Sequence, residues 1–139
     1  MTIVYFDSSA FVKLVVEEDG SDFAADLWDG CDAAVSSKLA YPEVRTALAA
    51  AGRAHRLVPA EQARAEAGWE EFWMTVRTVE LTDTITAHAG QLASSYALRG
   101  ADAVHLASLL AIGGADTLFA VWDQRLRNGA QAAGVRLAP

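Results

Sequence analysis

Four acidic side chains stand where carboxylates could gather around a metal ion: Asp7, Glu43, Asp102 and Asp123. Asp7 follows the apolar run 3–6 and Asp123 follows the run 117–122, so each aspartate is expected between a buried strand and a helix. In open α/β sheets, ligands bind in the crevice beyond the carboxyl ends of the strands. The two aspartates are therefore expected to face each other at one edge of a sheet.

The other two acids each lie at the start of a predicted helix. Glu43 follows Pro42, which is tolerated in a first helical turn because its missing N–H would be unpaired there. Taken singly, Glu43 would be explained by the helix macrodipole and Asp102 by an N-cap. Four acids in four such contexts exceed what capping requires. Clustered carboxylates repel one another unless a proton or a cation intervenes, and oxygen ligands suit Mg²⁺ or Mn²⁺. We therefore predict a shared metal site able to activate water against a phosphodiester.

Other potentially reactive side chains have simpler explanations. His105 lies three residues after Asp102 and could be a ligand or a general base, but its Ala, Val and Leu neighbours favour a buried or hydrogen-bonded structural role. His55 and His88 have no partner at ligand spacing, and the sequence has no CxxC or HExxH pattern, which argues against zinc. Cys31 is the only cysteine, so it cannot form an internal disulfide, and we expect an inert thiol.

Strand-like apolar runs alternate with longer helical segments, which predicts an α/β fold with a mainly parallel sheet wrapped by helices. The strands are expected at 3–6, 33–36, 78–81, 117–121 and 135–137. The helices are expected at 9–16, 21–28, 41–51, 60–75, 83–98, 102–112 and 124–133.

An aromatic stripe recurs at helical spacing in the helix expected at 60–75: Trp69, Phe72 and Trp73, followed by Val76. Core packing explains this stripe. Because the stripe is large for a small chain, a homodimer or partner surface is the alternative.

The length of 139 residues and a hydrophobic content of 53% predict a single domain over 1–139. No apolar run reaches the roughly 18 to 20 residues of a membrane span, and the start of the chain does not resemble a signal peptide, so we expect a soluble, cytoplasmic protein.

The net charge of −7 argues against bulk attraction of nucleic acid. The densest positive charge, at Arg53, His55 and Arg56, is either a solvated loop or a phosphate contact.

Four segments carry a family resemblance: VYFDSSAFVKLVVEE, SSKLAYPEVRTAL, LRGADAVHLASLL and FAVWDQRLRNGAQAAGV. Together, and in this order over nearly the whole chain, they resemble the PIN-domain ribonuclease toxins of type II toxin-antitoxin systems, the VapC family. Each segment alone is a weak signal, and their combination is specific. The resemblance implies a three-layer α/β/α sandwich and an Mg²⁺- or Mn²⁺-dependent endoribonuclease that leaves 5′-phosphate and 3′-hydroxyl ends on a structured RNA of the tRNA or rRNA class.

The resemblance also assigns roles to residues. Asp7, Glu43 and Asp102 correspond to the family's first three metal-site acids, and Asp123 to the fourth, more variable one. Ser9 lies where a hydroxyl often supports the first aspartate, and Arg125 follows the fourth acid as in many relatives. Val121 stands where many relatives carry Thr or Ser, so a polar contact beside the metal site is expected to be missing.

Partners follow from the resemblance as well. It implies a cognate antitoxin whose C-terminal segment lies in a groove near the acids and inserts a basic side chain among them, together with a homodimer or a toxin-antitoxin hetero-oligomer. Two other functions stay open. One is a PIN-fold module that binds RNA or protein without catalysis. The other is a haloacid dehalogenase-type phosphatase, which is disfavoured because that chemistry needs a second acid at the position of Ser9.

Overall fold

Parallel strands form the centre of the molecule. The computed structural model describes residues 1–113 and 116–139, and the strands found in these residues make one five-stranded parallel sheet in the order β3-β2-β1-β4-β5. They are β1 (Ile3–Phe6), β2 (Ala33–Ser37), β3 (Arg77–Val79), β4 (Thr117–Ala120) and β5 (Arg136–Ala138). The chain winds from β1 to β3 on one side and returns to add β4 on the other side of β1. Strand order thus reverses beside β1, where open α/β sheets bind ligands.

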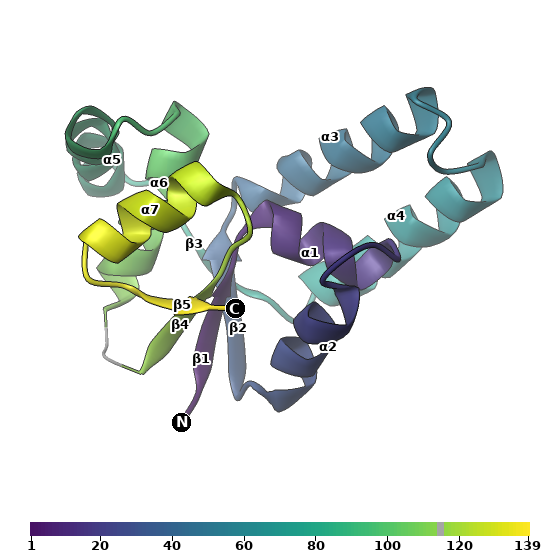
Figure 1. The fold of residues 1–139 in the computed structure, drawn as a ribbon, viewed down its shortest axis with the longest axis horizontal. Helices are drawn as coiled ribbons and strands as arrows, with labels where there is room; N and C mark the ends of the chain where they lie inside the picture. Colours follow the sequence, from purple (N-terminus) through teal and green to yellow (C-terminus); the bar gives the residue numbers. More distant parts are fainter. Residues whose placement is uncertain (114–115) are drawn as a thin grey trace.

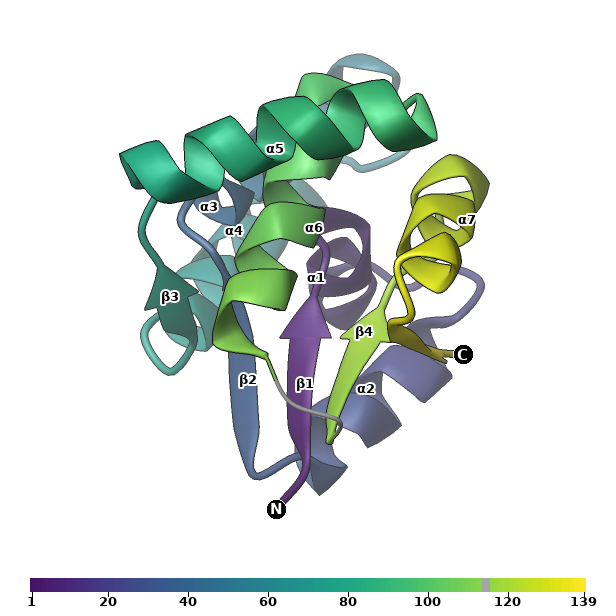
Figure 2. The same ribbon diagram turned by 90° about the vertical axis from the view of Figure 1, so that its left-hand side faces the viewer.

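Helices cover both faces of the sheet (Figure 1, Figure 2). In the described residues these are α1 (Ser8–Val15), α2 (Ser21–Gly30), α3 (Ala40–Arg53), α4 (Pro59–Trp73), α5 (Asp83–Tyr96), α6 (Gly100–Ile112) and α7 (Gln124–Ala132). None of them is both long enough and apolar enough to cross a membrane.

Alternating side chains of the central strands divide the core into two halves. Tyr5 on β1 and Phe119 on β4 pack under α5, α6 and α7, whereas Val4 and Phe6 pack under α1, α3 and α4. A strand that is buried on both faces has a continuous apolar sequence, because its side chains point alternately into the two halves of the core. The predicted three-layer α/β/α sandwich is confirmed.

Strand β3 is shorter than expected and begins earlier. It pairs only with β2, and this ladder ends where Ser37 pairs with Val79, because β2 itself ends at Ser37. Glu80 lies beyond the ladder, where its carboxylate forms an ion pair with Lys38 at 2.6 Å. The expectation of a strand reaching residue 81 was therefore wrong at both ends, since the partner strand sets the length of an edge strand.

Helices α3 and α4 form an antiparallel pair that extends beyond the sheet (Figure 1). Arg45 on α3 joins the pair through ion pairs with Glu66 and Glu70 on α4, at 2.9 and 2.8 Å. The basic residues at 53, 55 and 56 are exposed where the pair turns, which fits a solvated loop. The pair matters for the chemistry because α3 carries Glu43.

The aromatic stripe of α4 faces the core. Trp69 is fully buried, and its ring centroid lies 4.9 Å from that of Phe11 and 5.3 Å from that of Trp73. Its indole N–H donates a hydrogen bond to the carbonyl of Tyr41 at 3.3 Å. Core packing is thus confirmed for Trp69, and this side chain is not available as a dimer surface.

Candidate active site

All four predicted acids meet in one cavity of about 320 Å³ at the carboxyl ends of β1 and β4. Its wall consists of Asp7, Ser8, Ser9, Glu43, Arg99, Ala101, Asp102 and Asp123. Each acid comes from the junction or first turn of a different helix, so the sheet edge and the starts of α1, α3, α6 and α7 build the cavity together.

Asp7 is the most buried of the four acids. It is the N-cap residue of α1, although its side chain makes no capping hydrogen bond, and its backbone N–H donates to the carbonyl of Ala120 at 3.1 Å, which continues the pairing of β1 with β4. The Ser9 hydroxyl donates to Asp7 Oδ2 at 3.0 Å, in the manner the resemblance implies. Burial raises the pKa of the Asp7 carboxyl, although His105 and the hydrogen bonds from Ser9 and Ser8 oppose the rise. A buried carboxylate with a raised pKa in a cleft is a candidate for function.

His105 is fully buried on α6, and its hydrogen bonds reach the acids directly. Its Nε2 lies 2.6 Å from Glu43 Oε1 and 3.7 Å from Asp7 Oδ1, and its Nδ1 lies 2.9 Å from the Tyr5 hydroxyl oxygen. Burial lowers the pKa of His105, but the hydrogen bond to Glu43 and the charges of Asp7, Glu43 and Asp102 outweigh it, so that its pKa is raised. The buried, hydrogen-bonded role is confirmed. Its partners among the acids were not predicted.

Arg99 is the cation beside the acids. Its Nε donates to Asp102 Oδ2 at 2.8 Å, and its Nη2 lies 3.6 Å from Asp123 Oδ2. The sequence offered a signal for the first contact, because Arg99 and Asp102 are three residues apart at the start of a helix. Helix α6 begins at Gly100 with Arg99 as its N-cap, so Asp102 lies in the first turn and the N-cap explanation for Asp102 was wrong.

Asp123 has two roles. Its Oδ1 accepts a hydrogen bond from the Leu126 backbone N–H at 2.9 Å and so caps α7, while its Oδ2 faces Arg99 across the cavity. The capping bond fixes the carboxylate at the rim. Both contacts are possible at once because a carboxylate has two oxygens.

Two residues named by the resemblance lie elsewhere. Arg125 is exposed on α7 and is not part of the cavity wall. Val121 is fully buried in the core under α5, α6 and α7, so the chain places no hydroxyl at that position. The valine side chain has no polar atom, so it cannot make the polar contact that the resemblance associates with this position.

The donor set fits a hydrated divalent ion. Within the described residues, no three His, Cys, Asp or Glu side chains form a ready-made coordination group. The acids are instead paired with Arg99 and His105. Mg²⁺ usually retains several waters and binds one or two carboxylates, so a closed protein cage is not required. Four carboxylates around an open cavity of about 320 Å³ would offer such an ion oxygen ligands and room for its waters.

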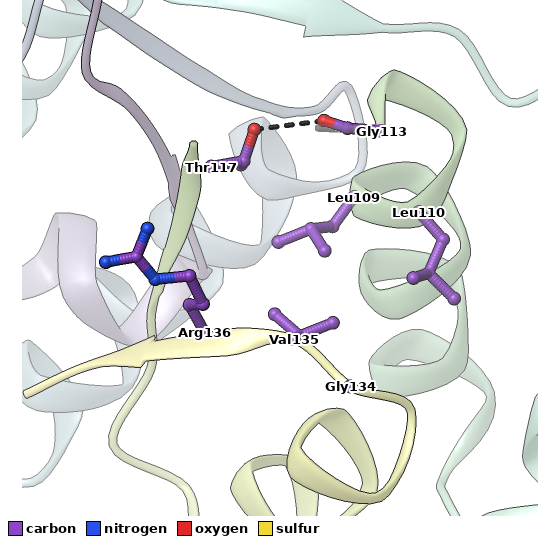
Figure 3. A pocket seen from close by; sticks show the side chains of 7 residues that line it. All are labelled: Leu109, Leu110, Gly113, Thr117, Gly134, Val135 and Arg136. Atoms are coloured by element: carbon purple, nitrogen blue, oxygen red, sulfur yellow. Dashed lines mark hydrogen bonds between the residues drawn. The ribbon is translucent and has the colours of Figure 1, made fainter. Parts of the chain in front are cut away.

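A second cavity, of about 220 Å³, lies at the opposite ends of β4 and β5 (Figure 3). Its wall consists of Leu109, Leu110, Gly113, Thr117, Gly134, Val135 and Arg136. The Thr117 hydroxyl is occupied there by a hydrogen bond to the Gly113 carbonyl at 3.0 Å. The acids that could hold a metal ion are at the other end of the sheet.

Known proteins resemble the chain in sequence. The PIN domain family model matches residues 4–130. Ribonuclease VapC45 of Mycobacterium tuberculosis (strain CDC 1551 / Oshkosh) and Ribonuclease VapC49 of Mycobacterium tuberculosis (strain ATCC 25618 / H37Rv) are each 63% identical over 139 residues, which cover 100% of this chain and 96% of theirs. Ribonuclease VapC46 of the latter strain is 33% identical over 135 residues, covering 97% of this chain and 95% of its own.

A solved structure resembles the chain in fold. In the crystal structure of VapBC2 from Rickettsia felis bound to a DNA fragment from their promoter, a chain superposes with a TM-score of 0.68. The match covers 99% of this chain and 98% of that one at 9% identity, which supports the fold alone. The family resemblance carried by the four sequence segments is confirmed: the chain belongs to the PIN-domain family and, within it, to the VapC group.

Proposed function

We propose that this protein is a metal-dependent endoribonuclease and the toxin of a toxin-antitoxin pair, acting in the cytoplasm on a structured RNA of the tRNA or rRNA class. The observation that carries the proposal is the convergence of four acids on one cavity, in a chain 63% identical to proteins named ribonucleases. An acid cavity beside a buried sheet edge suits phosphodiester hydrolysis, because the charge that develops there needs a cation.

Asp7, Asp102 and Asp123 would hold Mg²⁺ or Mn²⁺, and Glu43 would ligate the ion or orient water. When bound, the ion lowers the pKa of water and stabilises negative charge on the phosphodiester. Among the described contacts, His105 engages Oε1 of Glu43, which leaves Oε2 to accept a proton from water. The capped Asp123 and the Ser9-supported Asp7 keep their carboxylates facing the same space.

The alternative phosphatase needs an acid where Ser9 stands. The Ser9 hydroxyl donates to Asp7 instead, so this position supports a carboxylate and supplies no second one. The other alternative, a non-catalytic module, is distinguished from the nuclease by an RNA cleavage assay with and without divalent ions.

Removal of divalent ions is expected to abolish cleavage. A pool of small RNAs incubated with the protein and Mg²⁺ or Mn²⁺ should yield discrete fragments with 5′-phosphate and 3′-hydroxyl ends. EDTA should stop the reaction and excess Mg²⁺ should restore it, because the ion would activate the water and stabilise the negative charge on the phosphodiester. Gel analysis with end-group labelling measures both points. Equal cleavage in EDTA would refute the metal dependence, and a folded protein that binds RNA without cleaving it would favour the non-catalytic module.

An antitoxin is the partner we infer, in a groove that continues from the acids. Ser9 and Glu43 also line a neighbouring cavity that runs to Val12 and Ala47, and these two residues border a further cavity reaching Leu57. The result is a mainly apolar path between α1 and α3, with Glu17, Glu18 and Arg56 also in its walls, that ends at the acids. Arg99 already pairs with Asp102 at 2.8 Å, and a basic side chain of the antitoxin would bind the same group of carboxylates.

We expect the tagged protein, purified from its native host, to bring down a small basic protein that inhibits RNA cleavage. The net charge of −7 favours such a partner electrostatically. Light scattering of the complex and of the isolated chain tests the expected hetero-oligomer and homodimer. Purification of a monomer with no inhibitory partner would contradict this inference and leave the nuclease proposal standing.

A further inference from the structure

A continuous chain of hydrogen bonds runs from the interior of the sheet to the acid cavity. The Ser37 backbone N–H donates to the Tyr5 hydroxyl oxygen at 3.0 Å, which lies 2.9 Å from His105 Nδ1. His105 Nε2 lies 2.6 Å from Glu43 Oε1. The four residues come from β2, β1, α6 and α3. This series of hydrogen bonds therefore joins the sheet to helices of both outer layers (Figure 2).

The direction of these bonds follows from the donors available. A tyrosine hydroxyl keeps its proton at neutral pH and can accept and donate at once. Because the Tyr5 oxygen accepts from the Ser37 N–H, its own proton is free to point at His105 Nδ1. A neutral imidazole that accepts at Nδ1 carries its hydrogen on Nε2, and an imidazolium carries one there as well, so Nε2 donates to Glu43 in either form.

His105 cannot itself reach a substrate. Its side chain is fully buried, it is not part of the cavity wall, and both ring nitrogens are already engaged. Packing alone does not explain a histidine here. The edge-on contact with Tyr5, at 5.9 Å between ring centroids, could be made by an apolar side chain without burying two polar nitrogens. What an apolar side chain could not do is donate to Glu43.

We propose that His105 is a positioning residue, which holds Glu43 through the hydrogen-bond chain from Tyr5 so that one carboxylate oxygen is fixed and the other faces the acid cavity. Glu43 is partly exposed, and without this bond its flexible side chain would have several rotamers available. Buried partners that orient a metal-site carboxylate are a general device, and their loss typically costs metal affinity or activity about 10- to 100-fold. The inference rests on the proposed function.

Two substitutions at one position separate donation from packing. His105→Leu fills the buried space with an apolar side chain and removes the donor, whereas His105→Gln supplies an amide N–H in place of the imidazole N–H. We expect His105→Leu to lower kcat by roughly 10- to 100-fold with little change in KM for RNA, and to weaken Mn²⁺ binding measured by electron paramagnetic resonance of the free ion. His105→Gln should recover most of both losses. Tyr5→Phe removes a single hydroxyl and should give an intermediate loss.

A double-mutant cycle tests whether His105 acts through Glu43. In a Glu43→Gln background, His105→Leu should cause little further loss, because the group it positions is already changed. Additive losses would assign His105 a general structural role and overturn the proposal. If His105→Leu does not fold, Tyr5→Phe carries the same cycle.

The outcomes for the wild type keep this inference distinct from the proposed function. A wild-type protein that neither binds Mn²⁺ nor cleaves RNA overturns the proposed function and this inference with it. A wild-type protein that does both, with binding and kcat unchanged in His105→Leu and Tyr5→Phe, overturns only the inference.

Discussion

Asp7→Asn is expected to lower metal-dependent RNA cleavage by roughly 100- to 1,000-fold while the fold stays intact. Asparagine fills the same space and can still accept the hydrogen bond from Ser9, but it has no charge with which to hold a divalent ion. Single-turnover cleavage with saturating Mn²⁺ measures the loss. The exposed Asp26 of α2 offers a matched control, since Asp26→Asn makes the same chemical change away from the cavity and should leave the rate unchanged. Full metal-dependent cleavage by Asp7→Asn would show that this carboxylate is not part of the site.

The same substitution is expected to preserve or raise stability in the absence of metal. Burial raises the pKa of Asp7 above that of an exposed carboxyl, so the native state holds this proton more tightly than the unfolded state. The stability contributed by the protonated form is therefore present at acid pH and is lost as the pH rises through the folded-state pKa. The neutral amide of the Asp7→Asn variant would carry no such loss. Thermal unfolding with EDTA at several pH values should show the variant gaining on the wild type as the pH rises, which reflects the usual conflict between stability and function.

Trp69→Ala is expected to lower the free energy of unfolding by about 3 to 5 kcal/mol. The indole is fully buried, packs against Phe11 and Trp73, and donates to the Tyr41 carbonyl, so its removal leaves a large cavity and an unpaired acceptor. Urea denaturation followed by circular dichroism measures the change. Because Tyr41 lies two residues before Glu43, we also expect weaker Mn²⁺ binding in the surviving folded protein.

The control for this substitution lies at the end of the same helix. Met74 is 84% exposed, and Met74→Ala should change the free energy of unfolding by less than about 0.5 kcal/mol. A loss below about 1 kcal/mol for Trp69→Ala would mean that α4 is not held to the rest of the protein by this aromatic cluster.

The sheet could be predicted from the sequence because its central strands are buried on both faces. The runs 3–6 and 117–120 are uninterrupted by charge, and Asp7 directly follows the first, whereas Val121 and Trp122 separate the second from Asp123. Strand β3 was placed less well, since Arg77 and Thr78 are exposed and its length depends on β2. The single-domain interpretation remains a prediction.

The four acids could be predicted from their positions at the starts of helices, but their contacts with residues far away in the sequence could not. His105 binds Tyr5 and Glu43, which are 100 and 62 residues away in the sequence, and no local pattern encodes such pairs. Arg99 lies between the helices expected at 83–98 and 102–112, where a basic residue is also explained as part of a turn, so the sequence did not mark it as a site residue. Arg125, chosen by resemblance, has the right charge but lies on the exposed side of α7.

The order of the strands has a consequence for the synthesis of the protein. Strand β1 is translated first, yet one of its edges remains unpaired until β4 has been translated, because β4 is its neighbour on that side. Asp7 and Asp123 come together only at that step. A nascent chain that has folded only up to α5 therefore lacks two of the four acids, Asp102 and Asp123, so the acid cavity is incomplete until α6 and α7 have been translated as well.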